Sequence, residues 1–192
     1  MRRLLLIRHA STAAVKSSAF GADEDLDVAG TDAAASLRGL LPHRAEGLSS
    51  PARRARQTAA AAGLAVTVEP RLAECDFGRW AGRPLADVHA DEPDAVATWM
   101  RDPDAAPHGG ESLSGVLVRV RGWLDEQAAT DGTAIAVTHG GVVKAAVVCA
   151  LDATTAAFWR IDASPVSLTE LHAHDGRWTV TRVNERVGGL AA

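Results

Sequence analysis

The chain has 192 residues, of which 47% are hydrophobic and 23% are charged, and its formal net charge is −4. This length and composition are typical of one globular domain and exclude a disordered chain, and the weak negative charge provides no overall attraction to nucleic acid or to an anionic membrane surface. An anionic ligand must therefore be bound by a local cluster of positive charge.

In chain order, short β-rich segments alternate with longer alanine-rich segments of helical character, a pattern typical of α/β proteins. The predicted strands span residues 3–8, 47–49, 65–69, 133–138, 166–172 and 178–183. The predicted helices span residues 30–41, 52–62, 111–130 and 142–151. We therefore expect an α/β three-layer sandwich, with a mainly parallel central sheet, helices on both faces and an antiparallel edge strand that belongs to a terminal hairpin.

Residues 70–110 interrupt this alternation. Beyond Pro70, the segment carries prolines at 84, 93, 103 and 107 and glycines at 78, 82, 109 and 110. This is too irregular for one element, and so long an insertion in a compact domain is usually functional. We expect a single domain over residues 1–192 whose irregular segment at about 70–110 forms a cap over the substrate.

The cysteines and the apolar runs indicate a compartment. Cys75 and Cys149 are too few for a disulfide framework, which is typical of the reducing cytoplasm. The apolar run at residues 141–151 is interrupted by Lys144 and is far shorter than the about 20 residues that cross a bilayer. We expect a cytoplasmic protein with no nucleic-acid or membrane partner, in which the edge hairpin would permit a homodimer.

Charged side chains follow the buried strands at the point where each strand ends. Arg8 and His9 come directly after the aliphatic residues 4–7, and His139 follows residues 134–137. A run of arginines that includes Arg54 opens the helix after the strand at 47–49. Because ligands bind outside the carboxyl ends of parallel strands, we expect these side chains to meet in one site.

Such a cluster of arginines and histidines indicates an anionic ligand, because the positive groups would otherwise repel each other. A guanidinium group offers a planar fork that binds phosphate through two hydrogen bonds. Gly140 and Gly141 would let a helix begin close to the ligand, with its free N–H groups directed at the negative charge. The sequence therefore predicts a phosphoryl site.

Glu74 is the predicted general acid of this site. It lies in the turn-rich segment LAECDFGRWAG, together with Asp76, Phe77 and Trp80. A carboxyl group among apolar rings is suited to donating a proton near neutral pH. We expect Glu74 to protonate a leaving oxygen.

Together these motifs resemble the histidine phosphatase superfamily, the phosphoglycerate-mutase-like enzymes, and are most similar to its phosphatase branches, which include the α-ribazole phosphatases. Residues 8–12, with the sequence RHAST, are similar to the signature Arg-His-Gly-x-Thr. The segments SPARRARQTA, LAECDFGRWAG, GGES and VTHGG follow in the order found in the family. The chain departs from the family at Ala10, where the signature has glycine, and at Val15, where many relatives have an asparagine that positions the phosphate.

The resemblance implies a role for each site residue. His9 would attack phosphorus to form a phosphohistidine, and Glu74 would be the proton donor. The phosphate would be bound by Arg8, Arg54, His139 and Thr12, and His139 would also complete the catalytic set. The resemblance implies no metal and no cofactor.

The implied function is a metal-independent phosphomonoesterase acting on a small phosphorylated metabolite. The same residues would suit a cofactor-dependent phosphoglycerate mutase, which returns the phosphoryl group to its substrate. A protein phosphohistidine phosphatase, or a module that only binds phosphorylated ligands, is a further alternative. A metallohydrolase that uses His9, His139 and Glu74 is disfavoured, because Arg8 and Arg54 would oppose a divalent cation.

Overall fold

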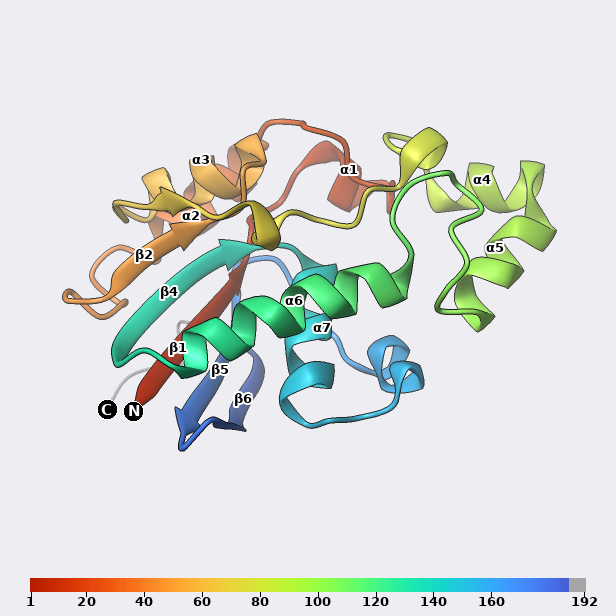
Figure 1. Ribbon diagram of the computed structural model, residues 1–192. Helices are drawn as coiled ribbons and strands as arrows, with labels where there is room; N and C mark the ends of the chain where they lie inside the picture. The colour runs from red at the N-terminus through yellow and green to blue at the C-terminus, as the bar shows by residue number, and fades with distance from the viewer. Residues whose placement is uncertain (187–192) are drawn as a thin grey trace.

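The computed structural model, which describes residues 1–186, contains a six-stranded sheet in the order β3-β2-β4-β1-β5-β6 (Figure 1). The parallel strands are β1 (Arg2–Arg8), β2 (Glu46–Ser49), β3 (Thr67–Val68) and β4 (Gly132–Thr138). β5 (Ser167–His174) runs antiparallel to β1, and β6 (Arg177–Arg186) pairs antiparallel with β5. The predicted α/β class, the mainly parallel sheet and the hairpin at one edge are confirmed.

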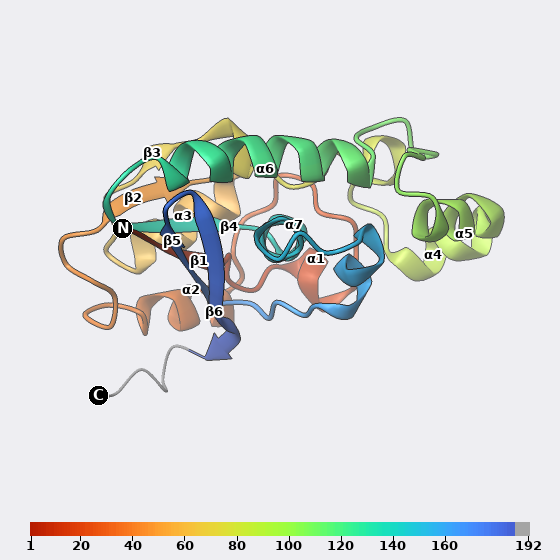
Figure 2. The same cartoon turned by 60° about the horizontal axis from the view of Figure 1, so that its bottom comes forward.

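Helices cover both faces of the sheet, which gives the three predicted layers (Figures 1 and 2). α6 (Leu113–Ala128) and α7 (Gly140–Ala150) lie on one face, and α2 (Val28–Ala35) and α3 (Arg53–Ala61) lie on the other. The strand sequences explain this arrangement, because successive side chains of a strand point to opposite faces. In β1, Leu4 and Leu6 belong to the core under α6 and α7, whereas Leu5 and Ile7 belong to the core under α3.

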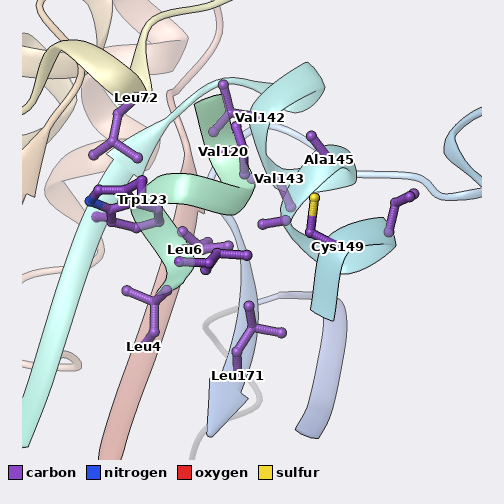
Figure 3. Packing of buried hydrophobic residues seen from close by; sticks show 14 of the residues in the cluster. Leu4, Leu6, Leu72, Val120, Trp123, Val142, Val143, Ala145, Cys149 and Leu171 are labelled. Carbon is purple, nitrogen blue, oxygen red and sulfur yellow. The ribbon is translucent and has the colours of Figure 1, made fainter. Parts of the chain in front are cut away.

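The larger core holds α7 against β1 (Figure 3). Val120 and Trp123 of α6 are fully buried, and they pack in one cluster with Leu4 and Leu6 of β1 and with Val143 of α7. Burial of each such large side chain contributes about 1.5–3 kcal/mol. Because Val143 lies one helical turn after the start of α7, this packing also fixes the N-terminus of α7 close to the carboxyl end of β1.

Two predicted elements depart most from the ranges that the sequence indicates. The helix predicted at 30–41 ends at Ala35, and Leu37 and Leu41 are buried from the turns that follow it. These leucines continue the apolar spacing of a helix, although the backbone around them is not helical. Gly39, which lies between them, adopts a left-handed φ of 75°. The strand predicted at 65–69 is reduced to β3, whose side chains are exposed.

The irregular segment contains short helical elements in place of one long loop. These are the 3₁₀ turns η1 (Pro70–Leu72) and η2 (Gly78–Trp80) and the helices α4 (Leu85–Asp91) and α5 (Pro93–Arg101). Pro84 and Pro93 stand at the starts of α4 and α5, where the missing N–H has no helical partner to lose. α4 and α5 lie beyond the carboxyl ends of the parallel strands, at the right of Figure 1.

An aromatic cluster links this segment to the loop after β1. Phe20 packs on Phe77, Trp80 and Trp99, with ring centroids 4.9–5.6 Å apart. His108 is 1% exposed and packs against Trp80. None of the helices within residues 1–186 is long and apolar enough to span a bilayer.

Candidate active site

The two predicted site histidines leave the sheet side by side. β1 and β4 pair in parallel as far as Arg8 opposite Thr138, so the next residue of each strand is a histidine. The backbone N–H of His9 donates to the carbonyl of Thr138 over 2.7 Å. The imidazoles of His9 and His139 meet edge to face, with ring centroids 5.1 Å apart. The strand register therefore accounts for the pairing of these two rings.

Arg54 lies between the two imidazoles. It stands in the first turn of α3, and its side chain is almost fully buried. Its Nε donates to Nε2 of His9 over 3.1 Å, and its Nη2 donates to Nδ1 of His139 over 3.1 Å. Its Nη1 donates to the carbonyl of Ala22 and lies 3.5 Å from a carboxylate oxygen of Glu24. One guanidinium group thus connects both histidines to the loop after β1.

These contacts define the protonation of the rings. Nδ1 of His9 lies 2.8 Å from the carbonyl of Ala10, which can only accept, so Nδ1 carries the proton and Nε2 carries the lone pair. Nδ1 of His139 accepts from Arg54, so the proton of His139 is on Nε2, which donates to Oγ of Ser50 over 2.7 Å. Each imidazole is neutral in this arrangement.

The surroundings of the two rings favour the neutral form. Burial, followed by the positive charge of Arg54, lowers the pKa of His9 to about 3. The same two causes lower the pKa of His139 well below its ordinary value. An imidazolium ion has no lone pair on Nε2, so the depressed pKa keeps the lone pair of His9 present at physiological pH.

Arg8 and Glu74 complete the site. Arg8 donates from Nη1 to the carbonyl of Ala163 over 2.6 Å, while its buried Nε has no partner within residues 1–186. Glu74 accepts from the backbone N–H of Cys75 over 3.0 Å and faces the N–H of Gly141, at 3.4 Å, in the first turn of α7. A buried donor without an acceptor is rare in folded proteins, and here it indicates room for a ligand oxygen.

These residues line a cavity of about 410 Å³, here called the phosphate cavity. Its wall includes Arg8, His9, Arg54, Glu74 and Val15. Four predicted site residues therefore meet around one space, and the valine that departs from the family signature lies on its wall. His139 is fully buried behind Arg54.

Thr12 is placed differently from the prediction. It is fully buried beside the phosphate cavity and does not line it. Its Oγ1 accepts from the N–H of Val15, which caps the short helix α1 (Ala13–Lys16), and donates to Glu24 over 3.2 Å. A direct contact between Thr12 and phosphate stays a prediction that this geometry does not support.

Trp80, which is close to Glu74 in the sequence, lies in the aromatic cluster, where its indole N–H donates to Glu92.

Three residues of the site were not singled out from the sequence. Ser50 accepts a hydrogen bond from His139. Glu24 forms an ion pair with Arg54 and accepts a hydrogen bond from Thr12. Thr58 accepts from the N–H of Ala10 over 3.0 Å and donates to the carbonyl of Arg54 over 2.7 Å. Ser50 and Thr58 both belong to the segment SSPARRARQTA, so their spacing from Arg54 was the available signal.

The site is electrostatically unsuited to a divalent cation. Arg54 places a guanidinium group within hydrogen-bonding distance of both imidazoles, where a metal would need their lone pairs. Within residues 1–186, no three His, Cys, Asp or Glu side chains are grouped so that they could hold a metal ion. The arrangement suits an anion with several oxygens.

Comparison with known proteins gives relatives over most of the chain. A Mycobacterium tuberculosis protein described as bifunctional is 33% identical over 95% of this chain and 54% of its own length, so the chain spans about half of that relative. Phosphoserine phosphatase 1 of Hydrogenobacter thermophilus is 29% identical over 96% of this chain and 92% of its own length. The structure of a mycobacterial glucosyl-3-phosphoglycerate phosphatase with VO3 has a TM-score of 0.84 and 31% identity, covering 96% of this chain and 100% of that one.

The motifs and the geometry agree with a family model. The model described as histidine phosphatase superfamily (branch 1) matches residues 4–186, a range that contains His9, Arg54, Glu74 and His139. With its histidine pair, its bridging arginine and this match over nearly its full length, the chain belongs to the histidine phosphatase superfamily.

Proposed function

We propose that this protein is a metal-independent phosphomonoesterase that hydrolyses a small phosphorylated metabolite through a phosphohistidine on His9. The main support is the position of Arg54 on the wall of the phosphate cavity. Its guanidinium group donates to both Nε2 of His9 and Nδ1 of His139. The phosphatase names of the relatives from Hydrogenobacter thermophilus and mycobacteria support a hydrolase.

In the first half-reaction, Nε2 of His9 attacks phosphorus. The N–P bond forms as the P–O bond to the leaving alcohol breaks, and protonated Glu74 gives its proton to the leaving oxygen. Arg54 turns from the ring nitrogens to the phosphoryl oxygens, and the free Nε of Arg8 gains an acceptor. The hydrogen bond from Nδ1 to the carbonyl of Ala10 keeps the ring of His9 oriented.

In the second half-reaction, water replaces the alcohol. Glu74, now a carboxylate, takes a proton from the water as its oxygen attacks phosphorus. The N–P bond breaks, its electron pair returns to Nε2 of His9, and inorganic phosphate leaves. Each residue is thereby restored to its starting state, and no group outside this chain and its substrate is consumed apart from the water.

The proposal includes a role for the irregular segment and a compartment. Residues 70–110 carry Glu74, and Leu85 of α4 lies on the wall of the phosphate cavity, so we assign this segment the covering of the substrate. The two cysteines, both free thiols, support a reducing compartment such as the cytoplasm. The net charge of −4 argues against nucleic acid as a partner.

The test is phosphate release from a panel of phosphomonoesters, with 4-nitrophenyl phosphate included and a metal chelator in excess. We expect release by the wild-type protein and loss of nearly all of it in His9→Ala. His174→Ala is the matched control, because that histidine is exposed at the end of β5.

Other outcomes of the same assay would replace the proposal. Interconversion of phosphoglycerates faster than phosphate release would identify a mutase. Activity that the chelator abolishes and zinc restores would identify a metallohydrolase. Binding without turnover of any monoester would identify a binding module.

A further inference from the structure

A second cavity, of about 240 Å³, adjoins the phosphate cavity and is here called the side cavity. The two cavities share Arg8, Glu74 and Phe77, but His9 and Arg54 do not line the second one. In an in-line displacement, the leaving oxygen lies on the side of phosphorus opposite the attacking Nε2. Because Glu74 must reach that oxygen, the rest of the leaving group extends past Glu74 into the side cavity.

The walls of the side cavity are mainly apolar, and four aromatic rings contribute to them. Trp159 lies at the centre of this wall, with ring centroids 4.9 Å from Trp99 and 5.2 Å from Phe158. Leu113 and Phe77 add further apolar surface. Such walls suit the carbon skeleton of a small leaving group and offer few hydrogen bonds of their own.

Lys144 is the exception on this apolar wall. It lies one helical turn after Gly140 and Gly141, so it shares the face of α7 that meets Glu74. Its Nζ lies 5.5 Å from the ring centroid of Phe158. Within residues 1–186 it forms no ion pair or hydrogen bond, whereas the other lysine, Lys16, pairs with Asp27 over 2.9 Å. Lys144 is a half-buried residue on the wall of this cavity, and its ammonium group is not engaged by a carboxylate, so it is available to an anionic ligand.

The charged residues of the side cavity favour a leaving group with one negative charge over a leaving group with two. Glu74 and Asp162 lie on its wall together with Arg8 and Lys144. Asp162 accepts from the N–H of Ala163 over 2.8 Å and from Asn184 over 3.2 Å. Once Arg8 binds the phosphoryl group, Lys144 is the remaining cation on this wall, and a second phosphate dianion would lie near the carboxylate of Asp162. A carboxylate therefore fits the side cavity best.

We infer that the side cavity binds the leaving alcohol and that Lys144 recognises a carboxylate on it, so that the preferred substrates are small phosphorylated hydroxy acids. This inference rests on the proposed function, and it names Lys144 as the residue that determines specificity. Arg8 and Glu74 would act on every phosphomonoester. Lys144 would contact only those whose leaving alcohol carries a carboxylate.

The kinetic test uses substrate pairs that differ by the carboxylate. Phosphoserine is compared with phosphoethanolamine, and 3-phosphoglycerate with glycerol 3-phosphate. We expect the wild-type kcat/KM to favour the acid of each pair, and Lys144→Met to lower that ratio by about 10- to 100-fold, the usual effect of losing a hydrogen bond to a charged group. Lys144→Arg retains the cation and should retain the preference, as should the control Lys16→Met.

A binding test separates recognition of the carboxylate from turnover. Calorimetry on His9→Ala and on His9→Ala with Lys144→Met measures the affinity ratio for the same substrate pairs. Equal affinity within each pair, or a preference that survives Lys144→Met, would overturn the assignment of Lys144. Binding that depends on Lys144 without phosphate release by the wild-type protein would support the side cavity and overturn the proposed hydrolysis.

Discussion

Nε of Arg54 donates to Nε2 of His9 over 3.1 Å, so the cation that we propose to bind phosphate and the nitrogen that we propose as the nucleophile orient each other before a substrate arrives. The lone pair of His9 accepts this hydrogen bond, and burial together with the charge of Arg54 lowers the pKa of His9 and favours its neutral form. A phosphoryl group would compete for the same donor, so its binding both occupies Arg54 and frees the nucleophile.

Replacement of Arg54 by lysine should therefore not be conservative. Lysine keeps the charge but loses the planar fork that reaches both imidazoles, and we expect Arg54→Lys to lower kcat/KM by about 10²–10³-fold. Steady-state kinetics on 4-nitrophenyl phosphate measures the change. Arg56→Lys, an exposed position on the same helix, is the control and should stay close to wild type.

Glu74→Gln tests the general acid through the leaving group. A glutamine cannot protonate an alkoxide, so turnover of an alkyl phosphate should fall far more than turnover of 4-nitrophenyl phosphate, whose phenolate leaves unprotonated. Asp76→Asn is the matched control, because Asp76 is exposed and, within residues 1–186, its carboxylate accepts only from the N–H of Gly78. Equal losses on both substrates in Glu74→Gln would remove Glu74 from this role.

Gly141→Ala tests the close approach of α7 to Glu74. A Cβ at position 141 would lie 2.3 Å from Oε1 of Glu74, so the carboxylate must move. We expect kcat for alkyl phosphates to fall while the chain remains folded. Gly122→Ala in α6 meets nothing within 4 Å and should keep full activity, with about 0.5–1 kcal/mol of added stability from the better helix former. Full activity of Gly141→Ala would show that the position of Glu74 is not critical.

The depressed pKa of His9 predicts acid sensitivity of the fold. An unfolded histidine titrates near 6.5, whereas burial beside Arg54 lowers the pKa of folded His9 to about 3. Between these values only the unfolded chain binds the proton, so the free energy of unfolding should fall as the pH drops from 6.5 towards 3. The slope from this group approaches about 1.4 kcal/mol per pH unit. Urea unfolding at a series of pH values should show a shallower slope in His9→Gln, and an unchanged slope would contradict the assignment.

The site could be predicted from the sequence where strand ends determine it. Arg8 is the last residue of β1, His9 and His139 directly follow β1 and β4, and the parallel register brings the two histidines together. Ser50 also follows a strand, β2, which pairs with β4, so the same rule places it near His139. The position of Thr58 could not be predicted in this way, because its hydrogen bond to the N–H of Ala10 depends on how α3 packs against the segment after β1. The family signature predicts that Thr12 binds phosphate, yet its hydroxyl is used by Val15 and Glu24.

The helices and strands could be predicted where the apolar periodicity of the sequence matches the backbone conformation. α6 and β4 lie close to their predicted ranges, since their apolar residues face one core. The helix predicted at 30–41 is too long because Leu37 and Leu41 are buried from turns that repeat a helical spacing. The helices of residues 70–110 are not predicted because Pro84 and Pro93 resemble interruptions in the sequence, whereas they begin α4 and α5.

The central claim, transfer of the phosphoryl group to Nε2 of His9, is tested most directly by trapping the intermediate. Rapid quenching during turnover, at a pH where phosphohistidine survives, followed by peptide mass spectrometry, locates the group. We predict one phosphoryl group on His9 in the wild-type protein and in His174→Ala, and none on His9→Ala. Phosphate release by a protein that never carries the group on His9, or carries it on another residue, would contradict the proposed mechanism.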